Sequence, residues 1–130
     1  MKCPCHSEKT YDSCCKPFHE GKALPKTPLE LMRSRYSAYA LNLCEYIIET
    51  THPNHPDAKK DPKKSYEDIK AFCEQTEFIN LKIISTSESA VTFHATLTIQ
   101  GEDSSFIEES TFTRVDGRWY YLLGKLLQKP

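Results

Sequence analysis

Four of the six cysteines in this chain lie within its first fifteen residues, as Cys3, Cys5, Cys14 and Cys15. Two close pairs joined by a short loop can supply the tetrahedron of soft thiolates that a structural zinc ion prefers. Disulfides fit this spacing poorly, because Cys14 and Cys15 are adjacent and bridges between the pairs would need demanding Cα distances. The spacing therefore predicts one zinc ion, with redox-active or adventitious thiols as the alternative.

The remaining composition is that of a globular protein. A length of 130 residues with 38% apolar and 27% charged side chains fits one ordinary domain plus a small appendage. No apolar run approaches the roughly 20 residues that cross a bilayer. The start Met1-Lys2-Cys3 shows no apolar core of a secretory signal, so we expect a cytoplasmic protein. A formal net charge of -1 gives no reason to expect DNA binding.

Residues 1–22 contain too few aliphatic side chains to bury a core, so a metal ion would have to hold them together. We therefore expect a small knob that is disordered without its metal. Lys2, Lys9, Tyr11 and Lys16 are its candidate contacts with a protein or ribosomal partner, unless the lysines are only solvated.

Two histidines, His6 and His19, flank the cysteine cluster. Either could replace Cys15 as the fourth ligand. Since four thiolates already complete a tetrahedron, the alternative is that both histidines are surface residues.

Two helices are predicted between the knob and residue 76. The run Thr27–Glu30 offers a hydroxyl N-cap, a proline at the first helical position and a glutamate that completes a capping box. Apolar side chains then recur at three- and four-residue steps through Ile47, which predicts one helix of about six turns ending before Pro53. A polar loop follows, and Ser65 is the expected N-cap of a second, shorter helix.

From Phe78 the apolar period changes from 3.6 to 2. Four strands are expected: one that places Ile79, Leu81 and Ile83 on its inner face, and three over residues 91–99, 106–115 and 118–123. Asp116-Gly117 predicts a tight hairpin turn, and Trp119, Tyr121 and Leu123 are expected on one face of the last strand. Helices followed by an antiparallel meander predict an α+β fold with the long helix packed on a curved sheet.

Three segments resemble known families. The run Cys3-Pro4-Cys5, Ser7, Tyr11 and Cys14-Cys15 resembles the SEC-C motif, the zinc knob of the preprotein translocase ATPase. The segments Leu31–Ala40 and Asp116–Tyr121 resemble the signatures of the bacterial YchJ family, which is largely uncharacterised. The resemblance implies a SEC-C knob at residues 1–22 and a cone-shaped nuclear-transport-factor-2-like domain at residues 27–130. The usual Gly-Ser-Gly after the first cysteine pair is here His6-Ser7-Glu8, which removes backbone freedom.

Cones of this type often enclose a pocket, so polar side chains directed inward are candidate site residues. We expect Arg33, Tyr36, His94 and Glu108 to contribute, with an arginine holding an anion and a histidine or carboxylate acting as a general base. Helical spacing separates Arg33 from Arg35 by about 200°, so at most one faces the interior. His94 alternates with the apolar residues of its strand. The alternatives are an arginine in a buried hydrogen-bond network and aromatic side chains that simply form the core.

The sequence thus favours binding over catalysis, with the knob as an interaction module. The second hypothesis is an enzyme or small-molecule binder that uses the cone interior, and the third is a zinc ion that only stabilises the N-terminus. A cone filled by Tyr39, Phe93 and Trp119 would leave no room for a ligand. Cys44 and Cys73, far from the cluster in sequence, are expected to be inert buried thiols.

Overall fold

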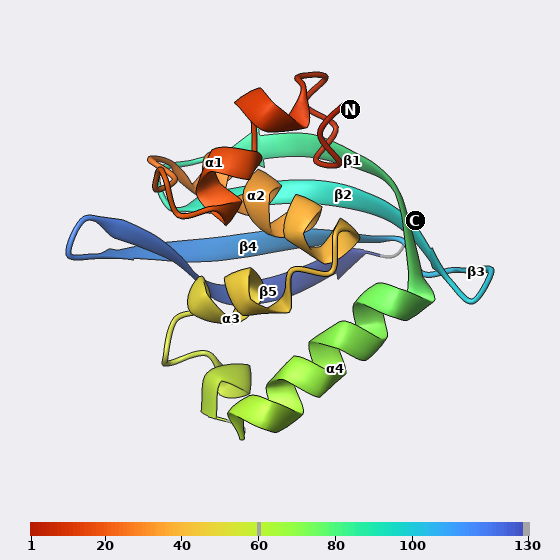
Figure 1. The fold of residues 1–130 in the computed structure, drawn as a ribbon. Helices are drawn as coiled ribbons and strands as arrows, with labels where there is room; N and C mark the ends of the chain where they lie inside the picture. Colours follow the sequence, from red (N-terminus) through yellow and green to blue (C-terminus); the bar gives the residue numbers. More distant parts are fainter. Residues whose placement is uncertain (60, 129–130) are drawn as a thin grey trace.

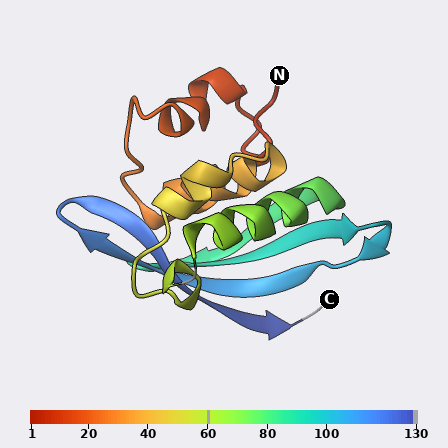
Figure 2. The same cartoon turned by 60° about the horizontal axis from the view of Figure 1, so that its bottom comes forward.

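The computed structural model describes residues 1–59 and 61–128 and shows a curved antiparallel sheet with helices on one face. The N-terminal knob lies on the helices, on the side away from the sheet (Figures 1 and 2). Four long strands pair in the order β1-β2-β4-β5, and the short β3 pairs with β2. Their bounds are β1 Thr76–Thr86, β2 Ala90–Ile99, β3 Glu102–Asp103, β4 Phe106–Val115 and β5 Arg118–Gln128. The predicted α+β class is confirmed.

The helical elements all precede the sheet in sequence. They are the 3-10 turn η1 Tyr11–Ser13, α1 Lys16–His19, α2 Pro28–Ala40, α3 Cys44–Glu49, the 3-10 turn η2 Pro56–Lys59 and α4 Pro62–Gln75. The predicted cap of α2 is present, because Thr27 Oγ1 accepts a hydrogen bond from the Glu30 N–H at 3.1 Å. The Glu30 carboxylate in turn accepts from the Lys26 N–H at 2.9 Å.

The single long helix predicted from Pro28 to a point before Pro53 is wrong, because the chain forms two helices separated by a turn. Asn42 adopts a left-handed conformation with φ 60°. Its N–H donates to the Tyr39 carbonyl at 3.2 Å, and the Leu43 N–H donates to the Ala38 carbonyl at 2.8 Å. This pair of bonds is a Schellman motif, whose left-handed residue is usually glycine and sometimes asparagine. The apolar period continues through the break, so periodicity alone could not reveal it.

The second predicted helix begins four residues earlier than expected. Asp61 is the N-cap of α4 and accepts a hydrogen bond from the Lys63 N–H at 3.1 Å, and Pro62 is the first helical residue. The N-cap and proline are arranged as in Thr27-Pro28. Ser65 therefore lies inside the helix, and Cys73 is the buried residue of its inner face.

Two β-bulges, one in each edge strand, change which side chains point to the inner face of the sheet. The alternation of β2 is confirmed, but a register shift after Phe78 turns Ile79 outward, where it is 45% exposed. A second shift in the pairing of β4 with β5, opposite Phe112, leaves Tyr121 inside and turns Leu123 outward. One extra residue reverses the face of every later side chain, so strict alternation failed at these points.

The hairpin between β4 and β5 forms as predicted. Asp116 and Gly117 both have positive φ, at 52° and 82°, as a type I′ turn requires. The strand that follows is longer than expected and continues to Gln128.

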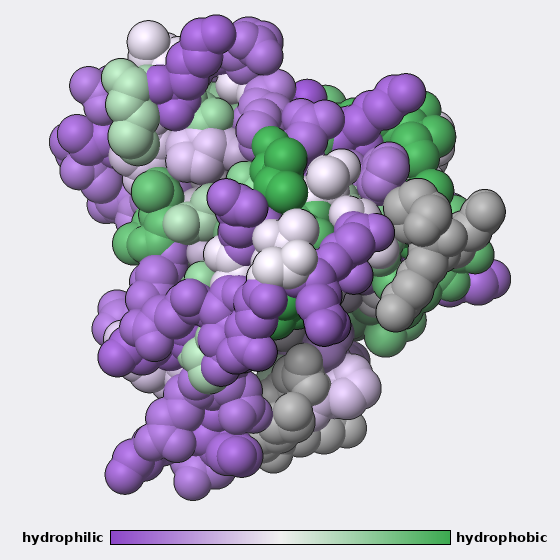
Figure 3. All heavy atoms as spheres, turned by 90° about the vertical axis from the view of Figure 1, so that its right-hand side faces the viewer, coloured by the Kyte–Doolittle hydropathy of each residue, from purple (hydrophilic) through white to green (hydrophobic). Residues whose placement is uncertain are grey.

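The main core lies between α2 and the concave face of the sheet. Its buried members are Leu31, Met32, Tyr36, Leu81, Val91, Phe93, Ala95, Leu97 and Phe112. None of the helices in the described part of the chain is long and apolar enough to cross a membrane. Hydrophilic side chains dominate the face of the molecule shown in Figure 3, where apolar side chains appear in separate groups.

Candidate metal centre and cavity

The four N-terminal cysteines converge on one point. Their sulfur atoms all lie within 4.8 Å of one another, and Cys14 Sγ is 3.6 Å from Cys5 Sγ and 3.9 Å from Cys15 Sγ. A tetrahedron with metal–sulfur bonds of about 2.3 Å has edges of about 3.8 Å. All four are free thiols, and Cys3, Cys5 and Cys15 are buried. The donor set therefore fits one tetrahedral metal ion.

A small hairpin brings the first cysteine pair into place. An isolated bridge joins Lys2 to Thr10, and the Cys3 N–H donates to the Lys9 carbonyl at 2.9 Å. At the tip, the His6 N–H returns to the Cys3 carbonyl at 3.2 Å. Cys14 and Cys15 then arrive from the short turn η1, directly before α1.

The loop after the first cysteine pair has a glycine-like backbone. His6 and Glu8 have φ of 62° and 73°, in the left-handed region that costs an L-residue about 1–2 kcal/mol. These are the two positions at which the SEC-C motif usually carries glycine. The departure noted in the sequence therefore leaves the loop in a conformation that suits glycine, with steric strain at these residues.

The thiols strongly perturb one another. A hydrogen bond from Cys15 lowers the pKa of Cys5 to about 4, despite the opposing effect of burial. Burial raises the pKa of Cys3 to about 11, and the hydrogen bond to Cys5 raises that of Cys15. One thiolate is thus stabilised by the protons of its neighbours. A bound cation would supply the charge needed to deprotonate all four.

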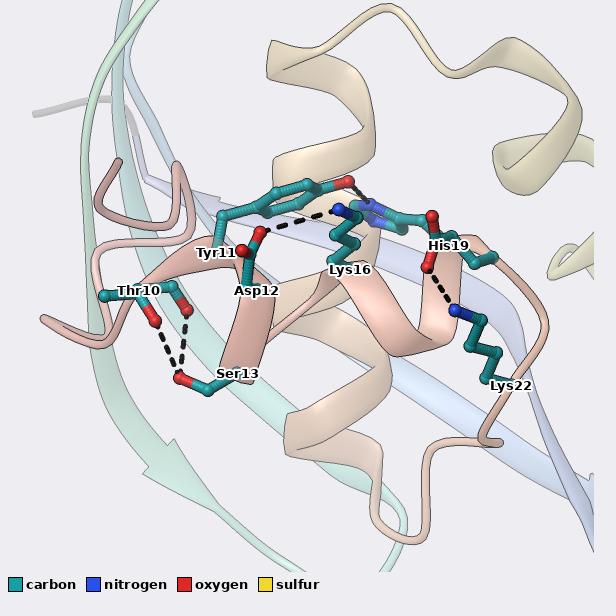
Figure 4. Close-up of polar contacts among 8 residues, drawn as sticks. Thr10, Tyr11, Asp12, Ser13, Lys16, His19 and Lys22 are labelled. Carbon is teal, nitrogen blue, oxygen red and sulfur yellow. Dashed lines mark hydrogen bonds and ion pairs between the residues drawn. The ribbon is translucent and has the colours of Figure 1, made fainter.

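Neither flanking histidine is directed at the sulfurs. The Tyr11 hydroxyl lies 2.7 Å from His19 Nδ1 (Figure 4), and His19 Nε2 lies 2.8 Å from the Ser34 carbonyl oxygen. Since Nε2 must donate to that carbonyl, Nδ1 accepts from Tyr11, and burial lowers the pKa of the ring. His6 meets the edge of the Tyr36 ring, with 5.9 Å between ring centres. Within the described chain, the group of side chains able to hold a metal is the four cysteines.

The knob is packed against α2. Arg33 Nη1 donates to the Cys5 carbonyl at 2.8 Å, which adds to the bond between His19 and Ser34. Ser34, Ser37 and Ala38 of α2 are fully buried, and their small side chains allow the knob to approach closely. Arg33, expected in the cone interior, therefore serves the interface between knob and domain.

The predicted partner-contact residues divide into two groups. Lys2, Lys9 and Lys16 are exposed or partly exposed, and two of them are paired: Lys2 with Glu8 at 3.0 Å and Lys16 with Asp12 at 3.6 Å (Figure 4 shows the second pair). Tyr11, by contrast, is partly buried against the cysteine cluster and holds His19. Tyr11 is therefore part of the internal structure of the knob.

A cavity of about 190 Å³, partly open to solvent, lies between α2, α4 and the concave face of the sheet. Of the four predicted pocket residues, Tyr36 and Glu108 line it. Arg33 does not, and neither does His94, whose side chain lies on the opposite face of β2 from its buried neighbours Phe93 and Ala95. The expected grouping of these four side chains in one pocket is therefore wrong.

The aromatic side chains expected to fill the cone leave it partly open. Tyr39 and Phe93 line the cavity. Trp119 instead donates its Nε1–H to the Lys26 carbonyl at 3.2 Å, near the start of α2.

Arg35, and not Arg33 as expected, is the arginine that faces the cavity. Its Nη1 donates to the Ile47 carbonyl at 3.0 Å and to the Thr50 and Thr51 hydroxyls at 2.7 Å and 3.2 Å. Its guanidinium carbon lies 4.5 Å from the centre of the Tyr121 ring, and the side chain lines the cavity. The expectation of an arginine in a buried hydrogen-bond network is confirmed for Arg35. The 200° separation from Arg33 was the signal that only one of the two faces inward.

Glu108 is an acid in an apolar setting. It lines the cavity from β4, and burial raises the pKa of its carboxyl. Ser110 Oγ donates to its Oε2 at 2.7 Å. The carboxyl group lies over Gly124 of β5, where a Cβ would come within 2.6 Å of Oε2 and would also meet the Tyr121 hydroxyl. A side chain at position 124 would displace both groups.

The two remaining cysteines match expectation. Cys44 and Cys73 are free and buried. Burial raises the pKa of both thiols, that of Cys73 to about 12, so neither is a ready nucleophile.

Comparisons with known proteins agree with this architecture. A family model described as "YchJ, middle NTF2-like domain" matches residues 27–124. A UPF0225 protein of Actinobacillus succinogenes is 38% identical over 126 residues, covering 92% of this chain and 79% of the relative. A UPF0225 protein of Deinococcus radiodurans is 36% identical over 121 residues, covering 92% and 85%.

Two solved structures share the fold. The solution structure of a SEC-C motif containing protein from Rhodopseudomonas palustris superposes with a TM-score of 0.79 at 35% identity, covering 98% of this chain and 100% of that one. The crystal structure of a SEC-C motif containing protein from Psychrobacter arcticus gives a TM-score of 0.72 at 23% identity, covering 98% and 84%.

Proposed function

This chain belongs to the YchJ family, and we propose that it is a zinc-stabilised binding protein whose knob is an interaction module. The observation that carries the zinc assignment is the sulfur tetrahedron of Cys3, Cys5, Cys14 and Cys15. Four thiolates in this geometry select zinc or an iron–sulfur centre over harder cations. The spacing between Cys14 Sγ and its two neighbours matches the edges expected around a single zinc ion.

The role of the zinc ion is structural in this proposal. Four protein ligands complete its coordination and leave no position for a substrate or a reactive water. Bound zinc supplies the free energy that holds residues 1–22 in shape, since these residues have no aliphatic core of their own. The site requires reduced thiols and therefore fits a protein of the reducing cytoplasm.

The interaction role follows from how the knob is placed. Arg33 and His19 fix its inner side on α2, and Lys2, Lys9 and Lys16 remain in contact with solvent. A rigid surface of this kind loses little conformational entropy on association. We propose that it meets a protein or ribosomal partner. The acidic neighbours of Lys2 and Lys16 limit the net positive charge, which favours a specific protein surface over general affinity for RNA.

Charge reversal tests the interaction role. We expect Lys2→Glu with Lys16→Glu to lose the partners that the zinc-loaded wild type captures from a bacterial lysate. The matched control is Lys64→Glu with Lys70→Glu on α4, where both lysines also have an acidic partner within 4 Å. Cys14→Ser should lose the same partners because the knob is no longer held by its metal. Partners that remain bound to the variant with both knob lysines reversed would refute the interaction role and leave zinc as a stabiliser only.

A second candidate function, the binding of a small molecule in the cone, is favoured by the cavity itself. A volume of about 190 Å³ remains between α2 and the sheet, because the large side chains of Tyr39 and Phe93 line this space without filling it. The partly buried carboxyl of Glu108 faces this space. An apolar cavity with a few convergent polar groups is the usual form of a ligand site.

A further inference from the structure

We infer that the cone cavity binds a small, flat aromatic compound that carries an N–H donor, and that Glu108 accepts the hydrogen bond from this donor. The inference rests on the second candidate function, small-molecule binding in the cone, and is independent of the zinc site.

The volume indicates the size of the ring system that the cavity can surround. A cavity of about 150 Å³ in a protein core accepts benzene, whereas pockets for drug-sized ligands begin at about 300 Å³. At about 190 Å³, this cavity therefore suits one or two fused rings with few substituents.

The walls favour an aromatic ring over an aliphatic chain. The cavity is lined mainly by aromatic side chains from the helices and the sheet, among them Tyr39, Phe72, Phe78, Phe93 and Phe106. Several of these rings already meet edge to face, for example Phe93 with Phe106 at 6.0 Å between centres. A further ring can extend this arrangement, since edge-to-face and offset contacts add stabilisation beyond the apolar area that they bury.

Glu108 is the reason to expect a hydrogen-bond donor on the ligand. Among the described residues, its carboxyl forms one hydrogen bond, from Ser110 Oγ to Oε2. Burial raises the pKa of this carboxyl more than the hydrogen bond and the positive charges of Arg35 and His55 lower it. A carboxyl group in apolar surroundings is costly unless its acceptors are satisfied. Oε1 is thus the acceptor available to a ligand. Gly124 adds a second, independent observation, because only a residue without a Cβ allows the carboxyl to lie where it does.

Arg35 gives no comparable reason to expect an anionic ligand. Its Nη1 already serves three acceptors on α3 and the residues that follow, and its planar group lies against Tyr121. A ligand carboxylate would also have to approach the carboxyl of Glu108 inside the same small cavity.

A second cavity of about 240 Å³ lies next to the first. Arg35, Tyr39 and Tyr121 line both cavities.

Pairs of probes with equal shape test the inference. The full chain, loaded with zinc and labelled with ¹⁵N, is titrated with indole and indene, with aniline and toluene, and with benzoate. We expect indole and aniline to shift amide resonances of β2 and β4 and to bind at least tenfold more tightly than indene and toluene, because a site built for a hydrogen bond rejects analogues without the donor. Benzoate should be the weakest probe.

Two neighbouring glutamates provide the matched variants. Glu108→Gln should lose most of the preference for indole over indene, since a neutral amide is a weaker acceptor than a carboxylate. Glu109→Gln, whose side chain lies on the opposite face of β4, should leave the preference unchanged. Equal binding of indole and indene, tighter binding of benzoate, or an unchanged preference in Glu108→Gln would overturn the assignment while retaining a ligand cavity. The absence of binding by every probe would overturn small-molecule binding in the cone as well.

Discussion

The left-handed backbone at His6 predicts an unusual order of zinc affinities. Replacing His6 by alanine or by glycine removes the same ring contact with Tyr36, so the two variants differ only in the Cβ atom and its effect on the backbone. At φ 62° alanine carries steric strain of about 1–2 kcal/mol that glycine does not. The lower entropy of alanine in the unfolded chain offsets about 0.4–1 kcal/mol of this. The His6→Gly variant should therefore fold about 0.5–1 kcal/mol more favourably than His6→Ala.

Zinc affinity reports this difference directly. Because the metal-free knob has no core, the free energy of metal binding includes the free energy of folding the loop. A gain of 0.5–1 kcal/mol corresponds to about two- to fivefold tighter binding. The assay is competition for zinc with a chromophoric chelator, performed on the full-length His6→Gly and His6→Ala variants.

Ser7 offers a control within the same loop. Its φ is not positive, so glycine gains no steric advantage there and Ser7→Gly should bind zinc more weakly than Ser7→Ala. Both substitutions remove the same contact between Ser7 Oγ and Cys14 Sγ, which lie 3.2 Å apart. Equal affinities for the two His6 variants, or tighter binding by His6→Ala, would refute the reasoning.

Three further predictions concern the cone. Because the pKa of Glu108 is raised, the folded chain binds the proton of this carboxyl more tightly than the unfolded chain does. The contribution of Glu108 to stability therefore falls as the pH rises from the ordinary glutamate pKa through the raised value. Measured by urea unfolding between pH 4 and 8, the free energy of unfolding of Glu108→Gln should lack this fall, whereas that of Glu109→Gln should keep it. Identical pH profiles for the two variants would contradict a pKa raised by burial at Glu108. Arg35→Met should lower the free energy of unfolding by about 3 kcal/mol, because buried acceptors lose a charged donor, whereas a loss near zero would show that the network is not needed. Gly124→Ala should destabilise by about 1–3 kcal/mol through overlap with Glu108 and Tyr121, and an unchanged midpoint of thermal unfolding would contradict this.

The parts of the fold that the sequence revealed are those controlled by local chemistry. The hydroxyl and proline at Thr27 and Pro28 set the start of α2, and Asp116-Gly117 set the hairpin. The strict alternation of β2 was equally clear, because this central strand is paired on both sides and contains no bulge in its pairing with β4. In each case the residues that determine the structure are neighbours in the chain.

The misassigned parts depend on single residues that act against a continuing pattern. Asn42 ends α2 although the apolar period runs on, and the bulge beside Ile79 reverses the face of a strand without any change in composition. Asp61-Pro62 had the chemistry of a helix start, but the polar residues around it favoured a loop. Such features depend on tertiary packing, which decides between local alternatives of similar free energy.

The candidate sites were predictable to different degrees. The cysteine cluster was visible in full, since sequence proximity already forces its two pairs together. The cavity was only half predicted: Tyr36 and Glu108 line it, and Arg33 and His94 do not. To predict which residues of a helix and two strands meet in one cavity, one must know which face of each element points inward. Helical spacing showed that one arginine at most points inward but left open which one.

Native mass spectrometry of the intact protein, purified under reducing conditions without chelators, tests most directly whether a single metal ion organises the N-terminal knob. We expect the mass of one zinc ion per chain, with Cys3, Cys5, Cys14 and Cys15 protected from alkylation until the ion is removed. A chain free of metal, an iron–sulfur cluster, or cysteines linked by disulfides would contradict the account.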